Sequence, residues 1–346
     1  MALTFEARSF GVPQDDRAAC FDISRLYRQI WLMIRTTVCL LVALFALPAA
    51  ALKVALLLPG SDTDKGWNQS AAEGLARVKK ELKAQTKVVT NVKSSDFYNQ
   101  IAAFAEDGYD VVLCHGGEFE KAAAQAARKY PKVRIVVGGC GVDIPGATAV
   151  EFIIRDASEL VGYVAGKVTK ANKVAFVGAM KVGPLEACYD GLSAGSKASN
   201  TAVTVIPALW TNSWDSPILA REATENAINA GADVIYQNVD AASAGVFQAV
   251  QAANKSGKTV FAFGCNSNQN DIAPEIILGS VVIDVPRAYF DLTREIASGK
   301  FTTGARKLGL AGGYVDLVLN EKHAALTAEI KKGVSDLREK RAERKE

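Results

Sequence analysis

Residues that signal catalysis or metal binding are scarce in this sequence. Its 346 residues include only two histidines and six cysteines, with no C-x-x-C pair and no zinc-ligand spacing. It also lacks a G-x-x-x-x-G-K-[ST] loop, a G-x-G-x-x-G opening a helix after the first strand, and a G-x-S-x-G elbow. Cys114 and His115 are neighbours on a predicted strand, so their side chains face opposite sides and cannot act as a pair. We therefore expect a protein that is not an enzyme and uses no cofactor or metal.

An excess of charge is lacking as well. The chain has 40 Lys and Arg against 37 Asp and Glu, a net charge of +3. The first 51 residues carry five Arg and four acidic residues, which leaves +2 for the rest. A nucleic-acid-binding face needs clustered positive charge, so we expect no nucleic-acid partner. The charged run 331–346 is expected to be a solvated helix end or a frayed tail.

One apolar run stands out, and it lies near the N-terminus. Arg35 precedes the run 38–47, which is followed by Pro48 and three alanines. This layout is typical of a secretory signal peptide, and the run is shorter than the roughly 20 residues that span a bilayer. Residues 1–51 are therefore expected to be a leader, with Met33 as an alternative start, and the mature protein to be periplasmic. Cys39 stands at the beginning of the apolar run and not after it, which disfavours a lipid anchor.

From Leu52 onward, short β-branched runs alternate with amphipathic stretches of helical period. The predicted strands are 54–58, 87–92, 111–114, 133–137, 149–153, 173–177, 203–207, 234–237, 260–263 and 276–283. Continuous apolar strands that alternate with helices are typical of parallel sheets covered on both faces. About ten strands are too many for one small sheet, and the series restarts near Asp156. The sequence therefore predicts an α/β fold with two Rossmann-like lobes.

Two helix starts can be predicted from local chemistry. Asp156 with Glu159 three residues later resembles a capping box. Ser216 followed by Pro217 has the composition of an N-cap with proline in the first turn.

Four cysteines lie beyond the leader, at 114, 140, 188 and 265. In an oxidising compartment they could form disulfides, but four cysteines allow three pairings. Cys114 and Cys140 each lie at the end of a predicted strand, which weakly favours that pair. Buried free thiols are the alternative.

Polar and aromatic residues gather after the strands, where open α/β sheets bind ligands. The candidates are Asp64, Trp67, Asn68, His115, Gly116, Glu186, Trp214, Asn238, Asp240, Asn266 and Asn268. An indole face stacks on a planar heterocycle, and Asn68 beside it offers a donor and an acceptor to the edge of a base. Alternatively, Trp67 packs on its own helix, Asn68 caps that helix, His115 is an ordinary hydrogen-bonding residue, and the amide-rich loops are turns.

Several segments, taken in order, resemble the basic membrane protein family of substrate-binding proteins, which includes purine-nucleoside receptors of ABC importers. They are residues 64–70, 73–75, 159–166, 210–215, 231–235 and the amide loop 266–270, and they run over nearly the whole mature chain. The resemblance implies a type I periplasmic binding protein fold with three crossover segments. We expect residues 52–152 with about 265–284 in the N-terminal lobe. The C-terminal lobe is expected to hold 153–264 with about 285–330.

The same resemblance implies roles for the candidate residues. Trp67 would stack on the base, Trp214 would close over it from the second lobe, and Asn68 would contact the base edge. Gly116 and its neighbours would line the first-lobe wall, opposite Glu186, Asn238 and Asp240. Nucleoside receptors of the family tend to carry an acidic residue in the amide loop and a lysine near position 283. This chain has Asn266, Asn268 and Ile283 there, which favours a nucleobase over a nucleoside.

The expected function is capture of a purine nucleobase or nucleoside by closure of two lobes, as the monomeric binding component of an ABC importer. Such a role implies a membrane permease and its ATPase as partners. The alternatives are a ligand-sensing module for a membrane receptor, or a periplasmic binder of another small polar ligand such as a sugar.

Overall fold

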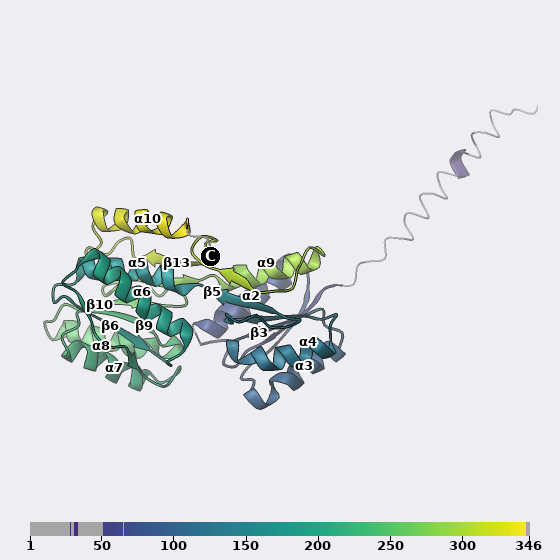
Figure 1. Ribbon diagram of the computed structural model, residues 1–346, viewed down its shortest axis with the longest axis horizontal. Coiled ribbons are helices and arrows are strands. Elements are labelled where there is room, and N and C mark those ends of the chain that lie inside the picture. Colours follow the sequence, from purple (N-terminus) through teal and green to yellow (C-terminus); the bar gives the residue numbers. More distant parts are fainter. Residues whose placement is uncertain (1–27, 29–30, 34–50, 65, 344–346) are drawn as a thin grey trace, which may run out of the picture. The chain divides into compact units, whose positions relative to one another are not determined.

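The computed structural model describes residues 28, 31–33, 51–64 and 66–343 (Figure 1). The apolar run 38–47 and Cys39, on which the signal-peptide and lipid-anchor predictions rest, lie outside the described residues. The chain divides into two units, and the second, Ala51–Glu346, contains both sheets. In the described part of the chain, no helix has the length and apolar character needed to cross a membrane.

The first sheet has six parallel strands in the order β12-β5-β4-β3-β1-β2. Its strands are β1 (Lys53–Leu57), β2 (Gln85–Val89), β3 (Val111–His115), β4 (Arg134–Gly138), β5 (Thr148–Phe152) and β12 (Arg306–Leu308). Its helices are α2 (Trp67–Leu82), α3 (Phe97–Glu106), α4 (Glu120–Lys129) and α9 (Val285–Ala297), with the short helices η1 (Ser94–Asp96) and η2 (Gly117–Phe119). Alternate residues of β1 enter two different buried clusters, as expected for a parallel sheet covered on both faces.

The second sheet has the order β13-β11-β10-β9-β6-β7, with β8 beside β6. Its strands are β6 (Lys173–Gly178), β7 (Thr204–Val205), β8 (Leu209–Trp210), β9 (Val234–Asn238), β10 (Phe261–Gly264), β11 (Ile277–Ile283) and β13 (Val315–Leu319), of which β13 runs antiparallel to β11. Its helices are α5 (Ile154–Val168), α6 (Gly183–Ser199), α7 (Pro217–Asn229), α8 (Ser243–Lys255) and α10 (Ala328–Ala342), with η3 (Asp240–Ala242).

The chain passes between the two sheets three times, as the resemblance implies. The passages lie between β5 and α5, between β11 and α9, and between β12 and β13. At the first passage, α5 packs tightly on α6 because glycine faces it. A Cβ on Gly195 would lie 2.0 Å from the carbonyl oxygen of Glu159. The predicted two-lobe α/β fold with three crossovers is therefore confirmed.

The predicted distribution of the C-terminal segments between the lobes is wrong. Residues 277–283 form β11, which is hydrogen-bonded between β10 and β13 in the second sheet and not in the first lobe. Helix α9 lies against α2, and β12 joins β5 in the first sheet, so much of 285–330 belongs to the first lobe (Figure 1). An apolar run in the sequence predicts a buried strand, but it does not indicate which of two sheets the strand joins.

The C-terminal run is a docked helix and not a frayed tail. Ile330 and Val334 of α10 are buried, and α10 lies against α5 (Figure 1). The Arg341 guanidinium donates hydrogen bonds to both carboxylate oxygens of Glu159, with Nε 2.7 Å from Oε2. Of the two alternatives predicted for 331–346, the helix end therefore holds over residues 331–342 and the frayed tail does not, while 344–346 lie outside the described residues.

Of the two predicted helix starts, one is confirmed. The Ser216 side chain accepts a hydrogen bond from the amide of Leu219, and Pro217 opens α7. The capping box at Asp156 is wrong, because α5 begins at Ile154 and its N-cap, Ile153, makes no side-chain hydrogen bond.

The four described cysteines are free and buried, which agrees with the second alternative from the sequence. The favoured Cys114–Cys140 pair is wrong for a reason of register. Cys114 lies opposite Val137 in the ladder between β3 and β4, three residues before Cys140. The Cys140 thiol instead lies 3.7 Å from the carbonyl oxygen of Val142.

Candidate ligand-binding site

The loop after β1 is organised by the Asp64 carboxylate. Its oxygens accept hydrogen bonds of 2.8–2.9 Å from the amides of Gly66, Asn68 and Gln69 and from the Asn68 side chain. The first N–H groups of a helix have no partner within the helix, and a carboxylate there also interacts favourably with the helix dipole. Asp64 therefore caps α2. Its predicted contact with ligand remains a prediction, and its carboxylate already has four donors.

Asn68 is buried beside this cap and carries an unused acceptor. Its Nδ2 donates to Asp64, whereas its Oδ1 is buried without a hydrogen-bond partner among the described residues. Leaving a buried acceptor unsatisfied costs about 1–3 kcal/mol. The alternative that Asn68 caps its own helix does not hold, because Asp64 does so. The free oxygen is suited to an N–H donor of a ligand.

His115 packs against the side chain of Trp67. The imidazole and indole rings are stacked, with centroids 4.0 Å apart and an interplanar angle of 24°. His115 Nε2 lies 2.9 Å from the Trp67 carbonyl oxygen, which can only accept, so Nε2 carries the hydrogen. Nδ1 then accepts from the hydroxyl of Tyr289 on α9, at 2.6 Å. Both ring nitrogens are therefore engaged, and His115 positions Trp67.

Burial keeps His115 neutral. Its side chain is fully buried, and desolvation lowers the pKa of His115 to about 3. Two other residues define the position of the indole. Phe152 meets it at right angles, with centroids 5.8 Å apart. A Cβ on Gly139 would lie 3.0 Å from Trp67 Cζ2, and Gly139 has a φ of +77°. Trp67 is therefore half-buried in a fixed orientation at the carboxyl end of the first sheet.

Gly116 has a conformational role next to this site. Its φ of +139° is one that other residues rarely adopt, and a Cβ there would lie 2.4 Å from a carboxylate oxygen of Glu118. Gly116 thus lets the chain turn from β3 into η2. Its predicted place in the ligand wall remains a prediction.

Asp240, at the start of η3, connects the second sheet to the first. Its Oδ1 accepts a hydrogen bond of 2.9 Å from the backbone N–H of Trp67, 173 residues away in sequence. A Cβ on Gly66 would lie 2.0 Å from the same oxygen, so only glycine allows this approach. Burial, reinforced by the nearby charge of Asp64, raises the pKa of Asp240 to about 7.

Two buried amides continue the polar surface behind Asp240. Asn266 Nδ2 lies 3.4 Å from Asp240 Oδ1 and 3.3 Å from Asn238 Oδ1. Asn238 Nδ2 in turn lies 3.6 Å from the sulfur of Cys188. Asn238, Asp240 and Asn266, which lie at or just beyond the ends of the neighbouring strands β9 and β10, are therefore brought together.

Trp214 lies beside the turn that carries Asp240. Its carbonyl oxygen accepts from the amide of Ala242, the last residue of η3, at 3.1 Å. Its side chain remains 41% exposed, a large apolar surface next to the junction. Trp210, the neighbouring tryptophan, packs edge-on against Phe176 and over Gly178 instead. Of the two tryptophans of this segment, Trp214 is thus the one with surface to offer a ligand.

Two predicted site residues have other surroundings. Glu186 is exposed on the first turn of α6 and lies 3.8 Å from the ammonium of Lys181. Asn268 is exposed, and its Oδ1 accepts from the amide of Asn270 within a turn. The structure does not bring either of them into the group around Asp240.

The rest of the amide loop serves the fold. Gln269 Oε1 accepts from Gln237 Nε2 at 2.8 Å and from the amide of Cys265, while Ser280 Oγ donates to Asn270 Oδ1. These buried side chains satisfy one another and hold the loop in place. Within the amide loop, Asn266 is the residue that joins the candidate site.

Tyr289 and Phe152 were missed by sequence reasoning. Tyr289 lies 174 residues from its partner His115, on a helix whose pattern indicates only an apolar face. Phe152 lies in a continuous apolar strand and reads as core. Within the described residues, no three His, Cys, Asp or Glu side chains are grouped so that they could hold a metal ion.

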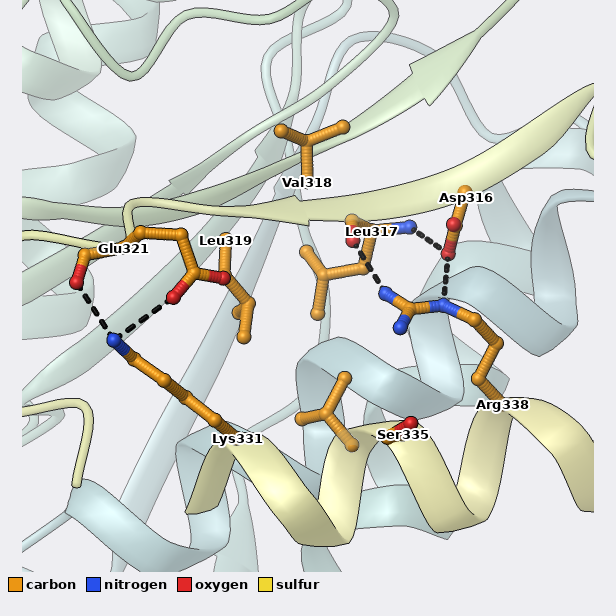
Figure 2. Close-up of a pocket in the computed structure, with 9 residues that line it drawn as sticks. Asp316, Leu317, Val318, Leu319, Glu321, Lys331, Ser335 and Arg338 are labelled. Atoms are coloured by element: carbon orange, nitrogen blue, oxygen red, sulfur yellow. Dashed lines mark hydrogen bonds and ion pairs between the residues drawn. The ribbon is translucent and has the colours of Figure 1, made fainter. Parts of the chain in front are cut away.

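A separate hollow of about 470 Å³ lies between β13 and α10 (Figure 2). Ion pairs cross it on either side, Lys331 with Glu321 and Arg338 with Asp316, each at 2.8 Å. Arg338 also donates to the carbonyl oxygen of Leu317, whose amide donates to Asp316. These contacts occupy the outer edge of β13 and protect it from pairing with another strand. The charged groups of the hollow are therefore already matched.

Two β-sheets flanked by helices are joined by three crossover segments, and their polar loops meet at Asp240 and Trp67. This arrangement defines a two-lobe periplasmic binding protein fold. Solved structures agree with this class. A solute-binding protein of an ABC transporter system from Aeropyrum pernix K1 superposes with a TM-score of 0.74 at 21% identity, over 84% of this chain and 91% of that one. A transcriptional activator of the comK gene from Bacillus halodurans gives 0.72 at 21% identity, over 84% and 98%.

Residues 51–345 match the family model described as "Bmp: ABC transporter substrate-binding protein PnrA-like", and the chain belongs to this family. Basic membrane protein A1 of Borrelia garinii subsp. bavariensis is 25% identical over 294 residues, 83% of this chain and 85% of that protein. Transcriptional activator protein med of Bacillus subtilis is 25% identical over 266 residues, 77% and 81%. The family resemblance is thus confirmed. The chain is a solute-binding protein of the ABC transporter type, and not an enzyme.

Proposed function

We propose that this protein captures a purine, a nucleobase in preference to a nucleoside, between the loops of its two sheets. It would deliver the purine outside the cytoplasm to an ABC permease driven by an ATPase. The observation that carries the proposal is the junction itself. Trp67, whose indole is fixed on the first sheet, donates its backbone N–H to Asp240 of the second sheet, and the exposed Trp214 lies beside the same turn.

The groups at this junction match the chemistry of a purine. A base stacked on an aromatic side chain typically gains about 1–3 kcal/mol. His115 covers one face of Trp67, so a purine would take the other, and Trp214 would approach from the second lobe. The unused Asn68 oxygen would accept an N–H of the base, while Asp240 and Asn266 offer acceptors and donors to its other edge.

Closure follows from the position of the Trp67–Asp240 bond. This contact requires the start of α2 and the start of η3 to lie together. A ligand that touches both sheets has its highest affinity for that arrangement and shifts the population toward it. The closed form would then be the one that the permease receives.

The preference for a nucleobase rests on the amide loop. Asn266 donates to Asp240 and Asn238, and Ile283 is buried. By the resemblance, an acidic residue and a lysine near these positions accompany ribose recognition. Their replacement by an amide and an apolar side chain leaves fewer groups for a sugar.

The direct experiment is mass spectrometry of small molecules released on denaturing the purified protein, followed by titration with adenine, guanine, hypoxanthine and their nucleosides. We expect a purine in the released fraction and tighter binding of a base than of its nucleoside. Release of a sugar, with no binding of any purine, would refute the proposal.

Trp67→Ala tests the stacking surface. We expect at least tenfold weaker purine binding, because the stacking free energy of about 1–3 kcal/mol is lost. Trp210→Phe is the matched control, since Trp210 packs inside the second lobe, and it should bind as the wild type does. Equal affinities of the two variants would remove Trp67 from the site.

A sensing role is the second candidate, favoured by the similarity to the protein of Bacillus subtilis named a transcriptional activator. The same purine site would then report to a membrane receptor. Affinity capture from membranes separates the two roles, because an importer component should retain a permease and a sensor should retain a receptor.

A further inference from the structure

Glu118 places a carboxylate beside the first-sheet half of the candidate site. It belongs to η2, the turn that follows β3 and His115. A Cβ on Gly116 would lie 2.4 Å from one carboxylate oxygen of Glu118 and 2.8 Å from the other. The carboxylate therefore folds back over the end of β3, and glycine at position 116 leaves room for it.

The turn that carries Glu118 is close to the indole of Trp67. The Cβ position of Gly139 is 3.0 Å from Trp67 Cζ2 and 3.9 Å from the backbone nitrogen of Gly117. Gly139 therefore lies between the edge of the indole and the start of η2. His115, the last residue of β3, stacks on the same indole. The carboxylate and the stacking surface are thus both placed by the ends of β3 and β4.

The turn itself is anchored in the first lobe. Phe119 is fully buried and stacks on Phe97, with ring centroids 3.7 Å apart. The amide of Phe119 donates to the carbonyl oxygen of Gly116 at 3.2 Å, and the amide of Gly116 donates to the carbonyl oxygen of Gly138 at 2.9 Å. A side chain presented by such a turn is already positioned before a ligand binds, which lowers the entropic cost of binding.

Among the residues that the structure describes, the Glu118 carboxylate has no ion-pair partner. Burial raises the pKa of Glu118, a hydrogen bond from the N–H of its own residue lowers it, and no charged neighbour contributes. The side chain is nevertheless exposed to solvent. A ligand can therefore reach a partly desolvated carboxylate, where hydrogen bonds are stronger than at a fully hydrated surface.

The groups left for a ligand on this side of the site are both acceptors. An ionised carboxylate such as that of Glu118 can only accept hydrogen bonds. Asn68 is restricted in the same way, because its Nδ2 donates to the Asp64 carboxylate and its Oδ1 has no partner within the described residues. N–H donors of a base satisfy such acceptors, whereas a ring nitrogen with a lone pair is repelled by them.

We propose that Glu118 is a specificity-determining residue, which selects a purine with two adjacent N–H donors on its six-membered ring, as in guanine. The inference rests on the proposed capture of a purine. The N1–H and the exocyclic amino group of guanine would donate to the two carboxylate oxygens, as a guanidinium does in a bidentate pair. Hypoxanthine offers only the first of these donors. Adenine directs the lone pair of its N1 at the carboxylate, so it should bind most weakly.

The test is equilibrium dialysis of guanine, hypoxanthine and adenine against the wild type and the Glu118→Gln variant. The wild type should bind guanine about tenfold or more tightly than adenine, with hypoxanthine between them. Glutamine replaces one acceptor with an N–H donor, so the ratio of guanine to adenine affinity should fall to about one or reverse. Because both affinities are measured on the same protein, this ratio does not depend on how much of the variant is folded.

Glu81→Gln is the matched control. Glu81 is exposed and pairs with Arg77 near the end of α2 that lies away from Trp67, so its variant should keep the wild-type ratio. If the wild type binds none of the bases or their nucleosides, the proposed function fails and the role of Glu118 fails with it. If purines bind but the wild type does not prefer guanine, or Glu118→Gln keeps the wild-type ratio, capture of a purine stands and the role of Glu118 is overturned.

Discussion

The two sides of the candidate site use polar groups in opposite ways. On the first sheet, the polar groups of Asp64 and His115 are hydrogen-bonded within the protein. Asp64 caps α2, and His115 holds Trp67 in position. On the second sheet, Asp240 and the amides behind it lie together at the junction, and burial raises the pKa of Asp240 to about 7. The first side thus supplies a rigid surface, and the second supplies groups that can exchange partners with a ligand.

The largest effect should come from breaking the contact between the sides. Gly66→Ala would place a Cβ 2.0 Å from Asp240 Oδ1, and the ψ of −122° that accompanies the φ of −148° at this position lies outside the regions that alanine favours. We expect ligand affinity to fall by roughly tenfold to a hundredfold, because the arrangement that contacts both sides is disfavoured. Isothermal titration calorimetry measures this directly.

Gly183→Ala is the control for that substitution, because a Cβ at Gly183 meets nothing within 4 Å. Its affinity should match the wild type, with a similar Tm. If Gly66→Ala also bound as tightly as the wild type, the Trp67–Asp240 contact would have no part in the bound state.

The second largest effect should come from the titration of Asp240, on the second-sheet side of the site. The pKa of Asp240 is raised from its ordinary 3.8 to about 7, so the folded state holds the proton more tightly than the unfolded state. The associated stability is complete below about pH 4 and is lost as the pH rises through 7. Between pH 5 and 8 this amounts to about 2–3 kcal/mol of unfolding free energy.

Asp240→Asn removes this dependence while tolerating the left-handed φ of +51°, which asparagine adopts readily. Urea unfolding at pH 5 and pH 8 measures both proteins. The wild type should lose about 2–3 kcal/mol more than the variant on going to pH 8. Parallel behaviour of the two proteins would show that Asp240 titrates at its ordinary pKa.

The smallest effect should come from the support of the first side. Tyr289→Phe removes the O–H donor to His115 Nδ1 and leaves a buried acceptor unsatisfied. We expect a loss of about 1–2 kcal/mol in stability, measured by urea unfolding, and a few-fold weaker ligand binding as Trp67 loosens. Tyr130→Phe, which removes a hydroxyl contact to the exposed Glu106, should change neither quantity. Identical behaviour of the two variants would mean that Tyr289 does not position Trp67.

Much of the fold could be predicted because the strands carry their own pattern. The runs around Val54, Val111 and Val234 are apolar along their whole length, which indicates a sheet covered on both faces. The strands β8 and β12 have only two and three residues, too few for a periodic pattern, and both were missed. The spacing of Asp156 and Glu159 predicts a capping box. In the structure, Glu159 is instead buried and paired with Arg341, which comes from a helix distant in sequence.

The candidate site was predicted only as a set of residue types after strands. This logic found Trp67, Asn238 and Asp240, because the carboxyl ends of parallel strands meet at one edge. It also selected Glu186 and Asn268, which have the same chemistry but lie in exposed positions. It missed Tyr289 because nothing in the sequence around a buried helical tyrosine indicates a histidine 174 positions earlier.

The sequence by itself determined the alternation of strands and helices, the family motifs and the polar residues at the strand ends, because these are local in the chain. Only the tertiary structure decided which sheet receives β11, which side chains the cysteines contact and which carboxylate lies at the Trp67 amide. Those outcomes depend on contacts between residues tens to hundreds of positions apart. Local propensity carries no information about such contacts, and the packing of the two sheets establishes them.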